Sequence, residues 1–368
     1  MEGYEGGAND VTLAHQNSSA VIGLVDATGQ PVVGTLAQRE RQLDTMLASG
    51  ATRAEGAGHR ARNEPSDEYR TCFERDRDRI LHSSAFRRLA GKTQVFIFPD
   101  DHMRTRLTHA LEVAQVATGI ARAVGLNVAL TEAIALGHDC GHGPGGHASE
   151  EAFDPFVTGG FDHATWGANV SLASLNLCRE TLDGIANHSW SRPAPSTPEG
   201  EVVSWADRIA YVCHDFEDAV AARIVTSEEL PALVRGRCGE RRGQQLGSFI
   251  NAMIRTITTS GVIGMDAAHA EALAAFRSFN YETIYLRDPS RQQAEAVVGM
   301  LRALVTYFAV NPTLIPDVAE RGREPESANR SLHDAVRYVA GMTDRFACHS
   351  AVTLLDWPID QLPNGIDR

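Results

Sequence analysis

One stretch constrains this chain more than any other: the thirteen residues from His138 to Glu150, with the sequence HDCGHGPGGHASE. It follows an apolar helical run, and its glycines and Pro144 prevent the helix from continuing. Ordinary turns also contain Gly and Pro, but this one carries three histidines and two carboxylates. Such clusters are typical of metal or catalytic sites. We therefore predict a functional site here, rather than a solvated loop that is rich in histidine by chance.

Length and composition limit the class of protein. A chain of 368 residues can bury a sizeable core. We expect an N-terminal tail and connecting segment over residues 1–62, a main domain over 63–350 and a C-terminal tail over 351–368. No apolar run reaches the roughly eighteen residues that a transmembrane helix needs, and the acidic start is unlike a signal peptide. The six cysteines form no C-x-x-C pair, so we expect neither a disulfide framework nor a cysteine zinc site. These features predict a soluble, cytoplasmic protein that does not bind membranes.

Charge is unevenly distributed along the chain. The formal net charge of −13 argues against a general nucleic-acid coat or a membrane-surface binder. Residues 70–106 nevertheless contain nine basic and five acidic residues, a local charge of +4. Such a segment suits a polyanionic small ligand such as a phosphate chain, although a solvated helix laced with ion pairs has the same composition. Lys92 is the only lysine among 34 Lys and Arg residues, which indicates that a compact ammonium is needed at this position.

Hydrophobic periodicity predicts a mostly α-helical protein. Apolar positions at helical spacing, separated by Gly and Pro, predict helices over residues 36–47, 79–90, 104–124, 127–138, 169–186, 202–224, 227–235, 246–260, 267–279, 291–310 and 331–347. Residues 92–98 are β-branched and aromatic, which favours a short strand or hairpin arm. Residues 50–62 are expected to be a mobile connection. We find no internal repeat and no strand-rich half, so the predicted fold class is all-α with minor peripheral extended segments.

Candidate metal ligands lie on three of these helices. His109 lies beside the apolar stripe of the 104–124 helix, and His138 and Asp139 end the 127–138 helix. Asp207, on the 202–224 helix, begins a row that continues through Tyr211 and Asp215 at intervals of four residues. His109 alone is more typical of a core histidine, but two imidazoles with two carboxylates form a donor set for a divalent cation. We expect Mn²⁺ or Mg²⁺, with Fe²⁺, Co²⁺ or Zn²⁺ as alternatives.

Several longer strings carry a resemblance to a known family. They are Phe86–Leu89 (FRRL), Lys92–Val95 (KTQV), Arg104–His109 (RTRLTH), the His138–Glu150 loop, Leu175–Leu177 with Thr181–Ile185, Ala206–Tyr211 (ADRIAY) and Gly341–Phe346 (GMTDRF). With the isolated His, the His-Asp pair and the distant Asp, they resemble the HD-domain deoxynucleoside triphosphate triphosphohydrolases, the dGTPase-like family. The match runs in order from about residue 69 to residue 347 and implies the helical HD-domain fold.

Two positions depart from the pattern of this family. Pro144-Gly145-Gly146 stands where the family usually has Pro-Phe-Gly, and Ala164 follows His163 where Asn is common. Loss of the Phe side chain removes an apolar wedge, so we expect a looser loop and a shifted substrate preference. The candidate metal ligands are unaffected, and we still expect activity.

The resemblance implies a reaction and a set of site residues. The reaction is attack of a metal-activated water on the α-phosphorus of a dNTP, with dGTP the first substrate to try, giving a deoxynucleoside and tripolyphosphate. The implied metal ligands are His109, His138, Asp139 and Asp207. The implied acid is His147, oriented by Glu150 and helped by His142 and His163. The implied substrate-binding residues are Arg87, Arg88, Lys92 and Arg106 for the phosphates, Gln94, Tyr211 and Asp215 for the sugar, and Tyr285, which closes the pocket or is a packed core tyrosine.

Other interpretations stay open at this level. One is an HD-family phosphohydrolase that acts on nucleoside monophosphates or cyclic dinucleotides, and another is a weakly active dNTP sensor that binds without turnover. The basic segment favours the longer phosphate chain. The resemblance also implies a homo-oligomer, with an allosteric nucleotide or single-stranded DNA as a further partner.

Overall fold

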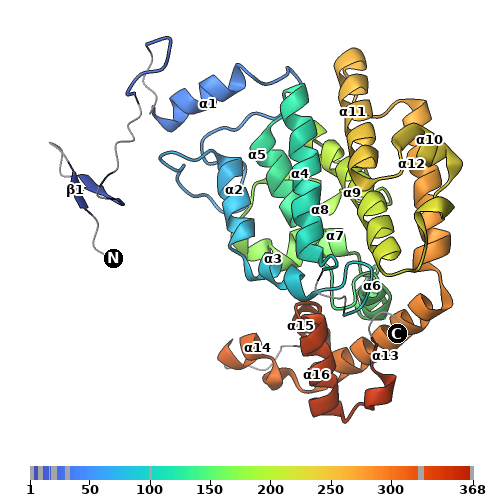
Figure 1. Cartoon of the computed structure of the whole chain (residues 1–368). Coiled ribbons are helices and arrows are strands. Elements are labelled where there is room, and N and C mark those ends of the chain that lie inside the picture. Colours follow the sequence, from blue (N-terminus) through green and yellow to red (C-terminus); the bar gives the residue numbers. More distant parts are fainter. Residues whose placement is uncertain are drawn as a thin grey trace.

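The protein is built mainly of helices (Figure 1). The computed structural model describes residues 4–6, 11–15, 17, 23–29, 34–98, 102–321 and 327–364. The helices are α1 (Leu36–Asp44), α2 (Cys72–Leu81), α3 (Ser84–Arg88), α4 (Arg106–Val124), α5 (Val128–Gly137), α6 (Ala148–Phe153), α7 (His163–Trp166), α8 (Arg179–Ala186), α9 (Pro198–Ala221), α10 (Ala232–Cys238), α11 (Arg242–Ser260), α12 (Ala267–Asn280), α13 (Asp288–Val310), α14 (Pro316–Arg321), α15 (Ala328–Ala340) and α16 (Asp344–Leu355). Strands β1 (Tyr4–Gly6) and β2 (Val11–Leu13) pair in a small antiparallel hairpin. The all-α prediction with peripheral extended segments is confirmed.

The larger hydrophobic core forms where α4, α5 and α9 pack together, with α2 and α8 against α5 (Figure 1). The Asn127 side chain caps α5 by accepting a hydrogen bond from the Leu130 amide at 3.2 Å. Leu130 and Ile134 are fully buried, so α5 packs inside the core along its length. α5 therefore ends in the interior of the protein, and it delivers His138 and Asp139 there.

A second core forms around α13, which packs against α6, α15 and α16 (Figure 1). Val297, Leu301 and Leu304 of α13 are buried in it. Among the described helices, α13 alone is long and apolar enough to cross a membrane. It packs against three other helices, and 39% of its apolar eighteen-residue window is buried.

Five predictions of local secondary structure are wrong. The helix expected over residues 227–235 is a 3-10 turn followed, after Pro231, by α10. The helix expected over residues 79–90 is two helices, because the Ser83 side chain accepts a hydrogen bond from the Phe86 amide and caps α3. Thr343 divides the expected 331–347 helix in the same way, by capping α16. Residues 169–186 contain a π-helical turn, a 3-10 turn and only then α8. Residues 92–98 form bends instead of a strand, with one isolated bridge between Thr93 and Thr105.

Residues 50–62, expected to be a mobile connection, pack against the body instead. Ala51 and Ala54 are buried. The Arg60 side chain is only 1% exposed and pairs with the fully buried Asp76 of α2 at 2.5 Å. The His59 carbonyl accepts from the Arg179 amide at the start of α8. A sequence rich in Gly, Arg and Ala thus hides a buried ion pair that joins this segment to the body.

Candidate active site

The four predicted metal ligands converge from α4, the end of α5 and α9. His109 Nε2 lies 3.1 Å from Asp207 Oδ1 and 4.0 Å from Asp139 Oδ2. His138 Nε2 lies 3.5 Å from Asp139 Oδ2 and 3.7 Å from Asp207 Oδ1. These separations are close to those between neighbouring ligand atoms that share one cation at about 2.1 Å. Residues that are 98 positions apart in the chain therefore present their donor atoms to one point.

The donor set fits a divalent cation. His138 Nδ1 lies 2.7 Å from the Ala135 carbonyl and donates to it, which leaves the Nε2 lone pair facing the cluster. That Nε2 atom is buried and has no hydrogen-bond partner within the described residues. A buried imidazole nitrogen without a partner, beside two carboxylates, is the arrangement that a cation satisfies.

The electrostatics of the cluster favour ionised carboxylates. Burial alone would raise the pKa of Asp139, but the Arg106 guanidinium, 2.7 Å away, and the neighbouring imidazoles hold it well below its usual range. Burial likewise opposes ionisation of Asp207, and His109 and His138 outweigh it, so the pKa of Asp207 is also lowered. Both groups are anions at neutral pH, as a cation site requires.

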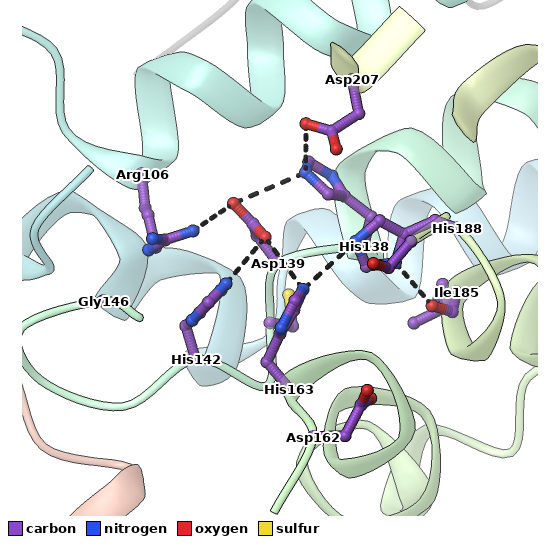
Figure 2. Close-up of polar contacts among 12 residues, drawn as sticks. Arg106, His138, Asp139, His142, Gly146, Asp162, His163, Ile185, His188 and Asp207 are labelled. Atoms are coloured by element: carbon purple, nitrogen blue, oxygen red, sulfur yellow. Dashed lines mark hydrogen bonds and ion pairs between the residues drawn. The ribbon is translucent and has the colours of Figure 1, made fainter. Parts of the chain in front are cut away.

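Three imidazoles of the predicted acid group surround the Asp139 side chain or line the space beside it. Figure 2 shows His142 and His163 on one side of Asp139, with Arg106 on the other. His142 Nε2 lies 3.4 Å and His163 Nε2 3.8 Å from Asp139 Oδ1. The His142 and His163 rings stack at 3.8 Å. His147 contacts the His142 ring edge at 4.9 Å between centroids.

Glu150 pairs with His163, not with His147. Its Oε1 atom lies 2.5 Å from His163 Nδ1 and also accepts from the His163 amide at 3.0 Å. Burial lowers the pKa of His163, but the hydrogen bond and the negative charge of Glu150, together with the charge of Asp139, outweigh burial, and the net shift is upward. Burial and then Arg106 lower the pKa of His147 to about 4. The expected orientation of His147 by Glu150 is therefore replaced by a Glu150–His163 pair, because α6 and α7 bring these two side chains together.

A cavity of about 430 Å³ opens beside the cluster, a size that accommodates a small organic ligand. Five predicted substrate-binding residues line it: Gln94, Arg106, Tyr211, Asp215 and Tyr285. The Tyr285 hydroxyl donates to Asp215 Oδ2 at 2.5 Å. Burial raises the pKa of Asp215 to about 7. The row of Asp207, Tyr211 and Asp215 that the sequence indicated thus faces one cavity from α9.

The structure does not bring Arg87, Arg88 and Lys92 to this cavity. Arg87 and Arg88 are exposed on α3, and Arg88 donates to the Gly341 carbonyl. The Lys92 ammonium is buried and donates to the carbonyls of His142 at 2.5 Å and Ala340 at 2.9 Å. Lys92 therefore joins the His138–Glu150 loop to the second core, and its predicted phosphate contact is replaced by a structural one.

The glycines of this loop are required by close contacts. Gly146 has φ +62°, and a Cβ atom there would lie 2.8 Å from Arg106 Nη2. Gly145 has φ +74°, and its amide donates to Asp344 Oδ1 at 2.8 Å. The loop that lacks the family's Phe is therefore held by a buried hydrogen bond to α16.

Comparison with known proteins agrees with this geometry. A family model described as HD domain matches residues 106–212, and one described as phosphohydrolase-associated domain matches residues 263–351. A deoxyguanosinetriphosphate triphosphohydrolase-like protein of Caldanaerobacter subterraneus subsp. tengcongensis is 41% identical over 82% of this chain and 90% of its own. Proteins of the same description are 40% identical in Clostridium perfringens (78% and 87% covered) and 37% in Desulfatibacillum aliphaticivorans (84% and 94%). The chain belongs to this dGTPase-like family.

The resemblance that the sequence carried is thereby confirmed. Among solved structures, a hypothetical protein from Aquifex aeolicus aligns with 75% of this chain and 67% of its own, at 18% identity and a TM-score of 0.44, a likeness on which no conclusion rests.

Sequence reasoning missed several residues of this dGTPase-like site. Arg208, Arg277 and Arg287 line the cavity, and none of them pairs with a carboxylate of the described residues. Arg208 directly follows Asp207 in a string already recognised, so its position was the available signal. Arg277 and Arg287 lie outside those strings and carried no signal. His188 was also missed; its Nε2 atom lies 3.2 Å from His163 Nε2, and both side chains are labelled in Figure 2.

Proposed function

We propose that this dGTPase-like hydrolase converts deoxynucleoside triphosphates, dGTP first, to a deoxynucleoside and inorganic tripolyphosphate. The relatives at 37–41% identity are named deoxyguanosinetriphosphate triphosphohydrolase-like proteins, and this name supports the proposed class of reaction. In the reaction, a water oxygen bonds to the α-phosphorus and the bond from phosphorus to O5′ breaks. O5′ leaves with the nucleoside and takes up a proton.

One observation carries this proposal: the cavity joins the His/Asp cluster to three guanidiniums without carboxylate partners among the described residues. These are Arg208, Arg277 and Arg287. Buried or half-buried arginines are normally paired, because an isolated charge in a cavity is unfavourable. Three unpaired guanidiniums in one cavity favour a ligand with several negative charges, and a triphosphate supplies them. A nucleoside monophosphate or a cyclic dinucleotide has fewer charges to offer at one end.

His109, His138, Asp139 and Asp207 would hold the divalent cation, which we propose is Mn²⁺ or Mg²⁺. Bound there, it would lower the pKa of a water and polarise the phosphate. Arg106 holds Asp139 by one Nη atom, while its Nε and Nη2 atoms are buried without partners in the described residues. Those free donors suit a phosphate oxygen next to the cluster.

A loop imidazole is proposed to give the proton to O5′. His163 is the best candidate, because Glu150 stabilises its protonated form, whereas burial and Arg106 disfavour protonation of His147. His142 and His147 are proposed to contact the phosphate as neutral donors. Gln94, Tyr211, Asp215 and Tyr285 are proposed to hold the deoxyribose, and the Tyr285–Asp215 pair provides polar partners for a 3′-hydroxyl.

Product chromatography across a nucleotide panel tests the proposal. We expect metal-replete protein to release tripolyphosphate and a deoxynucleoside from at least one dNTP, and Asp207→Ala to release neither. The panel includes nucleoside monophosphates and cyclic dinucleotides. Turnover of these but not of dNTPs, or release of only pyrophosphate or orthophosphate, would overturn the proposal. Binding of dNTPs without turnover would indicate the sensor instead.

A further inference from the structure

Trp190 is an indole at the edge of the cavity. It follows His188 in the loop after α8, it lines the cavity, and it is 46% exposed. Its orientation is fixed at two points. The indole Nε1 donates to the Ser204 carbonyl of α9 at 3.1 Å, and the ring packs in a T-shaped contact with Trp205 at 4.7 Å between centroids. A half-exposed aromatic side chain held in this way presents a preset face.

That face is covered by the Arg208 guanidinium. The Arg208 Cζ atom lies 3.4 Å from the centroid of a Trp190 ring, the distance of a stacked cation–π contact. Arg208 makes no hydrogen bond or ion pair with the described residues, and its Nε atom is buried without a partner. Stacking on Trp190 is therefore what orients this guanidinium.

A second arginine of the same cavity, Arg277, is oriented by a hydrogen bond as well as by an aromatic ring. Arg277 lies 4.2 Å above the Tyr281 ring, and its Nε atom also donates to the Tyr211 hydroxyl at 3.0 Å. A hydrogen bond thus fixes Arg277, whereas the closer contact with Trp190 is the main support of Arg208. Loss of the aromatic ring should accordingly affect Arg208 more than Arg277.

We propose that Trp190 is a positioning residue whose indole face holds the Arg208 guanidinium in the cavity, so that Arg208 binds the phosphate chain of the substrate. The inference rests on the proposed function for the identity of that chain. A nucleobase cannot use the same indole face, because Arg208 already occupies it at 3.4 Å. The effect of Trp190 should therefore follow the phosphates and be independent of the base.

A double-mutant cycle tests this inference. Trp190→Ala, Trp190→Phe, Arg208→Ala and the Trp190→Ala/Arg208→Ala double variant are assayed with all four dNTPs. We expect Trp190→Ala to raise KM by roughly 3- to 20-fold, by a similar factor for each active dNTP, with kcat changed less than about twofold. Trp190→Phe should recover most of the affinity, and Trp190→Ala should add nothing in the Arg208→Ala background. An unchanged KM, an effect that depends on the base, or a full effect without Arg208 would each overturn the proposal.

Binding of inorganic tripolyphosphate by calorimetry separates this inference from the proposed function, because it needs no turnover. If the protein binds tripolyphosphate in a Trp190-dependent way but hydrolyses no dNTP, the proposed function fails and the positioning role stands. If dNTPs are hydrolysed and tripolyphosphate affinity is unchanged in Trp190→Ala, only the positioning role fails. Trp357→Phe, at an indole of the C-terminal segment that does not line the cavity, is the matched control for Trp190→Phe. Unfolding temperature and bound metal are measured for every variant, so that a misfolded protein is recognised.

Discussion

The two walls of the cavity differ in whether their arginines are paired with carboxylates. On the wall formed by the start of α4 and the residues after α5, Arg106 pairs with Asp139 at 2.7 Å, and both side chains are at most 5% exposed. On the wall formed by α9, α12 and the start of α13, the guanidiniums of Arg208, Arg277 and Arg287 have no carboxylate partner in the described residues. Arg106 and Asp139 balance each other's charge on the first wall, and Asp207 of α9 completes the cation site there. The second wall keeps positive charge unpaired, which is favourable only when a ligand brings the anion.

Removal of Asp139 is expected to have the largest effect, because it breaks the balanced wall. Asp139→Ala leaves the Arg106 guanidinium buried and unpaired, and we expect a loss of about 3–5 kcal/mol of unfolding free energy. We also expect metal binding to disappear and kcat/KM to fall by about 10³-fold or more. Chemical denaturation, metal analysis and dNTP turnover measure these effects. Glu151→Ala, at an exposed acid beside the same loop, should change none of them; equal losses in both variants would contradict the assignment.

Removal of one arginine from the unpaired wall should reduce binding and leave stability intact. For Arg277→Ala and Arg287→Ala we expect KM to rise by about 10- to 100-fold, the value of one charge-assisted hydrogen bond. The unfolding temperature should change little, since neither variant loses an ion pair and Arg277→Ala loses one part-buried hydrogen bond, to the Tyr211 hydroxyl. Arg88→Ala, an exposed arginine outside the cavity, is the matched control. If KM changed as much in Arg88→Ala as in the cavity variants, the result would support the phosphate contact that the sequence predicted for α3.

Lys92 differs from the cavity arginines, because its buried ammonium donates hydrogen bonds that stabilise the fold. Lys92→Met removes the hydrogen bonds to the His142 and Ala340 carbonyls, and we expect a loss of about 1–3 kcal/mol of stability. The KM should change by less than about threefold when the assay is run well below the unfolding temperature. A large rise in KM without a change in unfolding temperature would instead identify Lys92 as a phosphate ligand.

A pH effect of smaller size is expected from Asp215. Burial raises the pKa of this carboxyl from 3.8 to about 7, so the folded protein binds its proton more tightly than the unfolded chain does. The stabilisation is complete below about pH 4 and is lost as pH rises towards 7. Asp215→Asn stays neutral throughout, so its unfolding temperature should gain on that of the wild type between pH 5 and pH 7. A constant difference over this range would show that the carboxyl is ionised in the fold.

The two walls also differ in how well the sequence predicted them. His138 and Asp139 were predictable because they lie together at the end of an apolar helix, and His109 and Asp207 because family strings surround them. The row of Asp207, Tyr211 and Asp215 followed from helical spacing alone.

The unpaired wall was harder to predict, because it is assembled from distant segments. Arg277 and Arg287 meet Arg208 only through the packing of α12 and α13, which no local pattern encodes. Lys92 was misassigned for a related reason. Its partners are backbone carbonyls at residues 142 and 340, and a sequence does not show which carbonyls a fold leaves free.

Hydrolysis of dGTP in water enriched in ¹⁸O tests most directly whether the two walls act on one triphosphate. Mass spectrometry of the products should show tripolyphosphate that carries one ¹⁸O atom and deoxyguanosine that carries none, since in the proposed reaction water adds to the α-phosphorus and the bond from phosphorus to O5′ breaks. Formation of dGMP with pyrophosphate, of orthophosphate, or of ¹⁸O-labelled deoxyguanosine would contradict the account.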